Sequence, residues 1–244
     1  MPQVEIYVQA RMSSTRLPGK VLREVMGKPL LEYQLERLKR VAGKPSVVVL
    51  TTTNQNDSEI VRVADRCGCS SFRGPEEDVL TRYFQCAMKR NPDAIIRVTA
   101  DCPLIDPLLI DEVIDTYKEH PYEIDYVSNT LTRNYPRGMD VELFSFTALE
   151  NTHLLAESDE EREHVTLYMY RHPELFKLQN VGEPHHDKNL RLTVDTEEDF
   201  ELIELILKTL YPQKPDFALD DVLALLDKHP EWKKINAHIQ QKSV

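Results

Sequence analysis

Short apolar runs alternate with amphipathic helical patterns along the first half of this 244-residue chain. In the stretch after the first run, Leu31, Leu35 and Leu38 recur at the spacing of one helix face. Apolar strands joined by such helices are typical of parallel sheets that are covered on both faces. The pattern therefore predicts an α/β fold with a mainly parallel sheet. The strands are expected at residues 4–8, 47–51, 70–73 and 94–99, and the helices at residues 29–42, 57–67, 76–90 and 106–117, with Asp57 as the cap of the second helix.

The residues that follow the first strand form a candidate anion site. Residues 9–20 contain three cations, three hydroxyls and one glycine. Arginine forks, a lysine ammonium and hydroxyl groups are the donors that bind phosphate oxygens, and ligands of open α/β sheets bind at the carboxyl ends of strands. The patterns of a P-loop and of a dinucleotide site are both missing, so side chains would hold most of the phosphate. A solvated basic turn is the plain alternative.

The composition limits the class of partner. The net charge is −11, which argues against a nucleic-acid partner, yet residues 11–44 hold nine Lys or Arg against three Asp or Glu. A local positive patch on an acidic protein suits a small anionic ligand. No apolar run approaches the length of a membrane span, and the N-terminus lacks the pattern of an export signal. Four cysteines without metal spacing complete the expectation of a cytoplasmic protein with reduced thiols.

Four motifs carry a resemblance to a known family. Residues 10–20 read A-R-M-S-S-T-R-L-P-G-K and resemble the opening signature of the cytidylyltransferases that make CMP-activated acid sugars, the CMP-KDO and CMP-sialate synthetases. The further motifs are F-R-G at 72–74, D-V-L-T-R-Y at 78–83 and R-V-T-A-D-C-P-L at 97–104. The whole pattern is more similar to the spore coat polysaccharide biosynthesis proteins of the SpsF type, over residues 4–205.

The resemblance implies a function and a fold. It implies a Rossmann-like domain of the nucleotide-diphospho-sugar transferase type that binds CTP and Mg²⁺. It further implies that an acid-sugar hydroxyl attacks the α-phosphorus, that pyrophosphate leaves, and that the CMP-sugar enters surface or spore-coat polysaccharide synthesis. The resembling synthetases are commonly homodimers. The choice of base stays open, because Thr99-Ala100-Asp101 stands where the KDO enzymes have Gln-Gly-Asp.

Candidate residues for nucleotide and metal follow from the loop and the resemblance. Lys20, which is expected in an exposed loop, would stabilise charge on the transferring phosphate, with Arg16 and Asp101 as further catalytic residues. Asp101 and Asp195 match the two magnesium aspartates of the resembling synthetases; a turn role and a helix-cap role are the alternatives. The candidate nucleotide-binding residues are Gln9, Ala10, Arg11, Ser14, Arg16, Lys20, Thr52, Arg73 and Asp78.

A further motif, Y-P-R-G-M-D-V-E at residues 135–142, is typical of the SpsF-type proteins. Arg137 would pair with a carboxylate of the acceptor, and Asp140 and Glu142 with sugar hydroxyls; a charged hairpin is the alternative. His164 is interpreted as a ligand contact or a packing residue, and the run His185-His186-Asp187 as exposed polar residues rather than a metal site.

The regular alternation fails from about residue 122 to 189. Within a single domain of residues 1–244, we interpret this region as an α+β insertion that carries the acceptor site and a dimer contact. A strand is expected at 139–144, helices at 146–156 and 159–171, and a return to strand at 189–194, before a long helix capped by Thr196. Four apolar residues of the region have no periodic partner and are candidates for the dimer surface: Leu131, Phe144, Leu154 and Leu155.

Two other functions stay open from the sequence. A glycosyltransferase of similar architecture would use a ready-made nucleotide sugar and release no pyrophosphate. A non-catalytic nucleotide-binding accessory protein of polysaccharide assembly would bind without turnover. The presence of Asp101 and Asp195 together with Lys20 counts against the accessory protein, because binding alone does not need all three.

Overall fold

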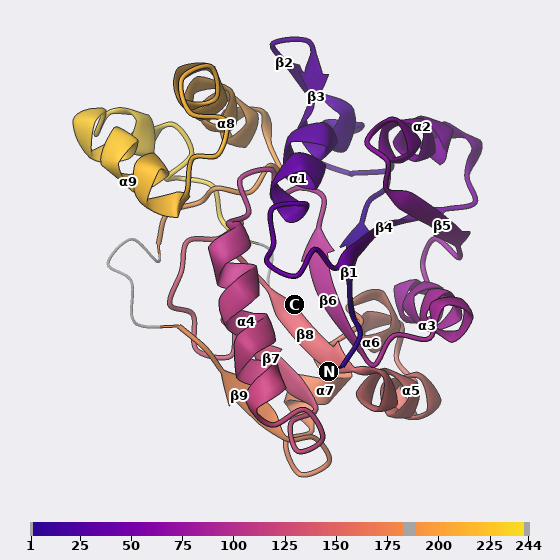
Figure 1. Cartoon of the computed structure of the whole chain (residues 1–244). Helices are drawn as coiled ribbons and strands as arrows, with labels where there is room; N and C mark the ends of the chain where they lie inside the picture. The colour runs from indigo at the N-terminus through magenta and orange to yellow at the C-terminus, as the bar shows by residue number, and fades with distance from the viewer. Residues whose placement is uncertain (1, 183–188, 242–244) are drawn as a thin grey trace.

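A seven-stranded sheet forms the centre of the computed structural model, which describes residues 2–182 and 189–241 (Figure 1). The strand order is β5-β4-β1-β6-β8-β7-β9. The strands are β1 (Val4–Gln9), β4 (Ser46–Thr52), β5 (Ser70–Gly74), β6 (Ala94–Thr99), β7 (Tyr126–Ser128), β8 (Glu142–Ser145) and β9 (Leu178–Asn180). The four strands predicted from apolar runs are all present and parallel to one another, and β8 alone runs antiparallel to its neighbours β6 and β7.

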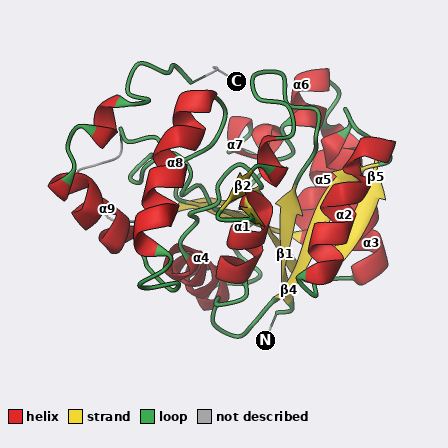
Figure 2. Ribbon diagram, turned by 90° about the horizontal axis from the view of Figure 1, so that it is seen from above, coloured by secondary structure: helices red, strands yellow, loops and turns green. Residues whose placement is uncertain are grey.

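Helices cover both faces of the sheet, which confirms the predicted fold class (Figure 2). Successive residues of β1 enter opposite layers, since Ile6 and Val8 lie in one core cluster and Tyr7 in the other. The helices of the first layer are α1 (Leu30–Leu38), α2 (Ser58–Arg66), α4 (Pro107–Glu119), α8 (Glu197–Leu210) and α9 (Leu219–Lys228). Those of the second are α3 (Val79–Arg90), α5 (Phe146–Leu155) and α7 (Leu167–Arg171), with α6 (Asp159–Glu163) beside α3.

Short elements complete the chain: the 3-10 helices η1 (Lys20–Leu22), η2 (Gln55–Asp57) and η3 (Trp232–Lys234), and a small hairpin of β2 (Glu24–Val25) and β3 (Lys28–Pro29). Side-chain caps fix where several helices begin. Thr196 and Asp199 form a capping box on α8, as Ser158 and Glu161 do on α6. The side chain of Asp78 caps α3, so this helix begins at Val79 rather than at residue 76.

The region after residue 122 extends the sheet beyond β6, and the sequence predicted it less well. β8 begins only at Glu142, because the side chain of Asn129 bonds the backbone of Met139 and Val141 in place of a neighbouring strand. The expected helix at 159–171 is broken into α6 and α7 at His164, whose backbone is not helical. The strands β7 and β9 are too short for a clear apolar pattern and were not predicted.

Two expectations about this region are wrong. No strand forms at residues 189–194, where the described residues show only an isolated bridge between Arg137 and Arg191. The opposite segment passes through Gly138, whose φ of +99° is not that of a strand, so the two segments do not continue as a ladder. Phe144 is also not a surface residue: it is completely buried on β8 and packs near Tyr83.

Gly138 gives a test of this close approach. A Cβ atom at Gly138 would lie 2.6 Å from the backbone carbonyl of Leu192, whereas Gly43, with φ +72°, has no atom within 4 Å of its Cβ position. Alanine at either position takes an unfavourable φ, but only Gly138→Ala also forces the two segments apart. We expect Gly138→Ala to lower the free energy of unfolding by about 1–3 kcal/mol more than Gly43→Ala. Urea unfolding measures both variants, and equal losses would contradict the tight contact.

Candidate active site

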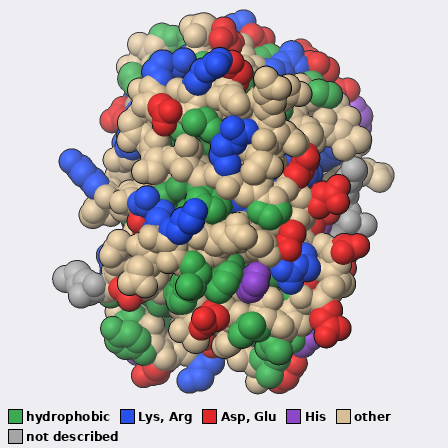
Figure 3. All heavy atoms as spheres, turned by 90° about the vertical axis from the view of Figure 1, so that its right-hand side faces the viewer, with side chains coloured by type: hydrophobic (Ala, Val, Ile, Leu, Met, Phe, Trp, Pro, Cys, Tyr) green, Lys and Arg blue, Asp and Glu red, His purple; other side chains and the backbone are tan. Residues whose placement is uncertain are grey.

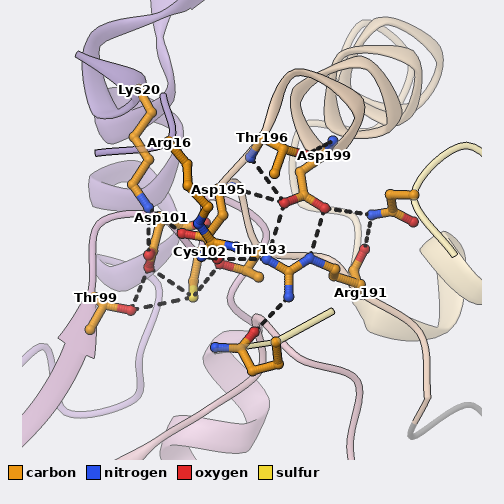
Figure 4. Close-up of polar contacts among 12 residues, drawn as sticks. Arg16, Lys20, Thr99, Asp101, Cys102, Arg191, Thr193, Asp195, Thr196 and Asp199 are labelled. Carbon is orange, nitrogen blue, oxygen red and sulfur yellow. Dashed lines mark hydrogen bonds and ion pairs between the residues drawn. The ribbon is translucent and has the colours of Figure 1, made fainter. Parts of the chain in front are cut away.

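Lys20 joins three distant parts of the chain at one point. Its Nζ donates hydrogen bonds to Oδ2 of Asp101 and Oδ1 of Asp195, each at 2.8 Å. Lys20 opens η1, Asp101 follows β6, and Asp195 precedes α8. Figure 4 shows both carboxylates turned toward the lysine ammonium. Lys20 is only 9% exposed, so the expectation that it lies in an exposed loop is wrong.

The charges of this cluster stabilise one another. Burial lowers the pKa of Lys20, but the two carboxylates raise it by a larger amount. The pKa of Lys20 therefore lies above its ordinary value. Burial raises the pKa of Asp101, yet the charge of Lys20 and hydrogen bonds from Lys20 and Thr99 outweigh burial and leave it lowered. Lys20 is therefore protonated and Asp101 ionised near neutral pH. Thr99 Oγ1, 2.6 Å from Oδ1, orients the Asp101 carboxylate.

Two arginines also form ion pairs with Asp195. Arg16 Nη2 lies 2.9 Å and Arg191 Nη2 2.6 Å from Asp195 Oδ2. Arg191 also binds Asp199, which is fully buried and accepts the backbone N–H groups of Asp195 and Thr196. The cap of α8 is Thr196, so the Asp195 side chain is not used as a helix cap and binds the three cations instead. The helix-cap alternative for Asp195 therefore does not apply. Arg191 was not predicted, since it stands in no recognised motif.

The loop that carries Lys20 is tied back to the sheet by Asp57. The Asp57 carboxylate, 2% exposed, accepts the backbone N–H of Met12 at 2.8 Å and bonds the backbone N–H and hydroxyl of Thr52. Asp57 makes no side-chain cap on α2, so its predicted role is wrong. Gly19 takes the left-handed conformation, with φ 70°, and donates its N–H to the Met12 carbonyl, which turns the chain toward Lys20.

A cavity of about 300 Å³ lies beside the cluster. Its lining includes most of the candidate nucleotide residues together with both candidate metal ligands. The predicted residues that line it are Gln9, Arg11, Ser14, Arg16, Lys20, Asp101 and Asp195. His164 also lines this cavity, from the break between α6 and α7. The structure thus brings together cations and hydroxyls from the loop with two carboxylates that follow it by 81 and 175 residues.

Four candidate nucleotide residues lie outside this lining and contact protein groups instead. Ala10 is buried and continues the backbone bonding of β1. Thr52 binds Asp57, Arg73 donates to the carbonyls of Thr52 and Asn54, and Asp78 accepts hydrogen bonds from Thr81 and Arg162. A nucleotide contact by these four residues stays a prediction.

A second cavity of about 730 Å³ adjoins the first. The two share Thr99, Asp101, His164 and Gln241 in their walls. All three candidate acceptor residues line the second cavity: Arg137, Asp140 and Glu142.

The three acceptor candidates differ in their contacts. Asp140 accepts two hydrogen bonds from Arg133, at 2.6 and 2.9 Å. Glu142 accepts from Tyr126, Thr166 and Arg97. The guanidinium of Arg137 forms no hydrogen bond or ion pair with any residue in 2–182 or 189–241. Burial and the nearby charges of Arg133 and Arg191 lower the pKa of Arg137, and they outweigh the opposing charge of Asp140.

Asp101 and Asp195 are chemically suited to Mg²⁺. Their carboxylate oxygens lie on either side of one ammonium nitrogen, in the wall of a cavity lined by cations. Among the described residues, no group of three or more Asp, Glu, His or Cys side chains forms a metal site. Mg²⁺ ordinarily binds proteins through one or two carboxylates and takes its other ligands from water and phosphates, which fits this pair. His185, His186 and Asp187 lie outside the described residues.

Comparison with known proteins gives the family. Residues 6–221 match the model of a family described as Cytidylyltransferase. The chain belongs to the cytidylyltransferase family. It is 33% identical to the spore coat polysaccharide biosynthesis protein SpsF of Bacillus subtilis, covering 95% of this chain and 97% of that protein. It is 37% identical to an uncharacterized protein of Methanocaldococcus jannaschii, covering 97% and 95%.

Solved structures agree with this assignment. A cytidylyltransferase from Leptospira borgpetersenii superposes with a TM-score of 0.91 at 34% identity, over the full length of both chains. A CMP-KDO synthetase solved with CTP has a TM-score of 0.64 at 20% identity, over 84% of this chain and 98% of that one, and so shows the shared fold. The predicted resemblance is confirmed: this cytidylyltransferase is a nucleotidyltransferase-family enzyme. Within the described residues, none of its helices has the length and apolar character needed to span a membrane.

Proposed function

We propose that this cytidylyltransferase transfers CMP from CTP to a hydroxyl of an acid sugar and releases pyrophosphate. One observation carries the proposal: Lys20 is held between Asp101 and Asp195 beside a cation-lined cavity. Asp101 also lines a second cavity, together with Arg137, whose guanidinium is unpaired among the described residues. CTP bound in one cavity and an acid sugar bound in the other would meet at this shared wall.

The nucleotide would bind in the smaller cavity. A nucleoside triphosphate carries about four negative charges near pH 7, and Arg11, Arg16 and Lys20 offer three cations to it. Lys20 would stabilise charge that develops on the α-phosphate oxygens as the acceptor oxygen bonds to phosphorus and the bond to pyrophosphate breaks. When bound, Mg²⁺ would be held by Asp101 and Asp195 and would neutralise phosphate charge.

The acid sugar would bind in the larger cavity. Arg137 is the cation there whose guanidinium forms no hydrogen bond or ion pair with another described residue, and guanidinium groups bind carboxylates through two parallel hydrogen bonds. Arg133 is already paired with Asp140, and Arg97 with Glu142. The carboxylate of the acceptor would therefore pair with Arg137, while Asp140 and Glu142, which line the same cavity, would accept hydrogen bonds from sugar hydroxyls.

The biological role is proposed from the relatives. The SpsF relative is named for spore coat polysaccharide biosynthesis, and the alignment spans nearly all of both chains. We therefore place the product in surface polysaccharide synthesis and the protein in the cytoplasm, where CTP is available. The cysteines Cys67, Cys69, Cys86 and Cys102 are free thiols, which suits a reducing compartment.

Pyrophosphate release tests the proposed function. The protein with Mg²⁺ should release pyrophosphate only when CTP and an acid sugar are both present, and a panel of nonulosonic acids would identify the acceptor. Preference for a hexose 1-phosphate would replace the acid-sugar proposal with ordinary sugar-phosphate nucleotidylyl transfer. Sugar transfer from a supplied nucleotide sugar without pyrophosphate would favour the glycosyltransferase, and nucleotide binding without turnover would favour the accessory protein.

Lys20→Ala tests the assigned centre. The substitution removes the charge that faces the transferring phosphate, so turnover should fall by about 100-fold or more. Lys44→Ala, at an exposed lysine, is the control and should keep wild-type turnover. Circular dichroism confirms that each variant folds, and near-wild-type turnover of a folded Lys20→Ala protein would remove Lys20 from the mechanism.

Arg137→Lys tests the acceptor site. Lysine keeps the charge but loses the planar fork, so the acceptor KM should rise by on the order of tenfold while the CTP KM stays nearly constant. Arg133→Lys is the matched control in the same cavity, because Arg133 already binds Asp140. A change in the CTP KM alone would move Arg137 to the nucleotide site.

A homodimer is also part of the proposal. Leu131, Leu154 and Leu155 are 36%, 74% and 48% exposed. Hydrophobic side chains gather in the lower half of the face in Figure 3, on the side of the molecule where α3 and α5 lie in Figure 1. Light scattering should give about twice the 28.3 kDa chain mass, as a specific interface needs only about 800 Å² from each partner. A monomer at high micromolar concentration would contradict the dimer and leave the catalytic proposal intact.

A further inference from the structure

The last described residues, 236–241, return to the active site although they lie beyond residues 6–221, which match the family. Asn236, 3% exposed, anchors this segment by donating from Nδ2 to the Arg191 carbonyl and to Asp199 Oδ1, both at 2.9 Å. The chain then turns, with Ile239 N–H bonded to the Asn236 carbonyl, and Gln241 meets the Arg191 side chain. The anchor thus fixes where the end of the segment lies.

Arg191 fixes the orientation of the Gln241 carboxamide. Arg191 Nη1 lies 2.6 Å from Gln241 Oε1. A guanidinium can only donate hydrogen bonds, so the carboxamide oxygen must face it and the NH₂ group must point elsewhere. Gln241 Nε2 has no hydrogen-bond partner within residues 2–182 and 189–241. The same guanidinium binds Asp195 and Asp199, as Figure 4 shows, so the amide is oriented by a group that also holds a candidate metal ligand.

Gln241 stands where the cavities meet. It lines the nucleotide cavity, the acceptor cavity and a third cavity of about 460 Å³ that is also lined by Arg137 and Arg191. The side chains that share these walls with Gln241 include the cations Lys20, Arg16 and Arg137 as well as the carboxylates Asp101 and Asp195. An oriented, unpartnered N–H donor among these cations suits an oxygen of an anionic ligand.

We infer that Gln241 is a substrate-contacting residue and that Arg191 is its positioning residue. Gln241 Nε2 donates a hydrogen bond to an anionic oxygen at the junction of the two cavities, either a phosphate oxygen of CTP or the carboxylate of the acceptor. This inference rests on the proposed function. It extends the active site to the C-terminal segment, which supplies a wall and a donor to the reaction centre.

Three substitutions separate substrate contact from a structural role. Gln241→Ala removes the donor. Gln241→Glu keeps the size of the side chain and keeps an acceptor for Arg191, but it replaces the donor with a negative charge. Gln240→Ala is the matched control, because Gln240 is the neighbouring glutamine, exposed like Gln241, and lines none of the three cavities.

The measurements are the KM values for CTP and for the acceptor in the pyrophosphate assay, together with melting temperatures. We expect Gln241→Ala to raise one KM about tenfold, Gln241→Glu to raise the same KM further at an undiminished melting temperature, and Gln240→Ala to match wild type. A rise in the CTP KM assigns the contact to the phosphate, and a rise in the acceptor KM assigns it to the carboxylate.

Unchanged KM values in both Gln241 variants, with or without a lower melting temperature, would overturn the inference while the proposed function stands. Absence of pyrophosphate release from the wild-type protein with every acceptor would instead overturn the proposed function and the role of Gln241 with it. The wild-type assay therefore separates the two failures.

Discussion

The placement of one ammonium group between two carboxylates determines the geometry of the candidate active site. Lys20, Asp101 and Asp195 are far apart in the chain, and each is largely shielded from water by the other two and their neighbours. A charge left unpaired in such a place costs several kcal/mol, so the loop after β1, the end of β6 and the start of α8 must assemble together. The proposed catalytic centre and the packing of the two halves of the chain therefore depend on the same contact.

The cations around Asp195 fall into two groups with different consequences. Arg191 is 5% exposed and is bound to the fully buried Asp199, so it is part of the framework. Arg16, whose side chain is 28% exposed, and Lys20 line the cavity. A triphosphate would compete with Asp195 for Arg16 and Lys20, whereas Arg191 would keep the carboxylate in place. Without a ligand, the same cations prevent repulsion between Asp101 and Asp195.

The sequence predicted what depends on local pattern or on the resemblance. Apolar periodicity located β1, β4, β5 and β6, and the loop composition located Lys20 and Arg16. The sequence did not predict the contacts of Asp57, Arg191 and Gln241, because these contacts join residues that are far apart in the chain. Asp57 binds Met12, 45 residues away, and Arg191 binds Gln241, 50 residues away. The error at Phe144 has the same origin: a short antiparallel strand inside the sheet buries its side chain, and so short a strand shows no clear alternation.

The antiparallel strand β8 also explains how the two cavities come to adjoin. Its register places Glu142 opposite Arg97 of β6, and the two side chains form an ion pair. Arg97 Nη2 lies 3.3 Å from Oε1 of Gln9 in the proposed nucleotide cavity, while Glu142 lines the proposed acceptor cavity. Burial raises the pKa of Glu142, but Arg97 and hydrogen bonds from Thr166 and Tyr126 hold it below its ordinary value, so the pair stays ionised near neutral pH. A shift of one residue would turn Glu142 to the opposite face of the sheet. The register of one strand pair therefore sets the spacing between the two cavities.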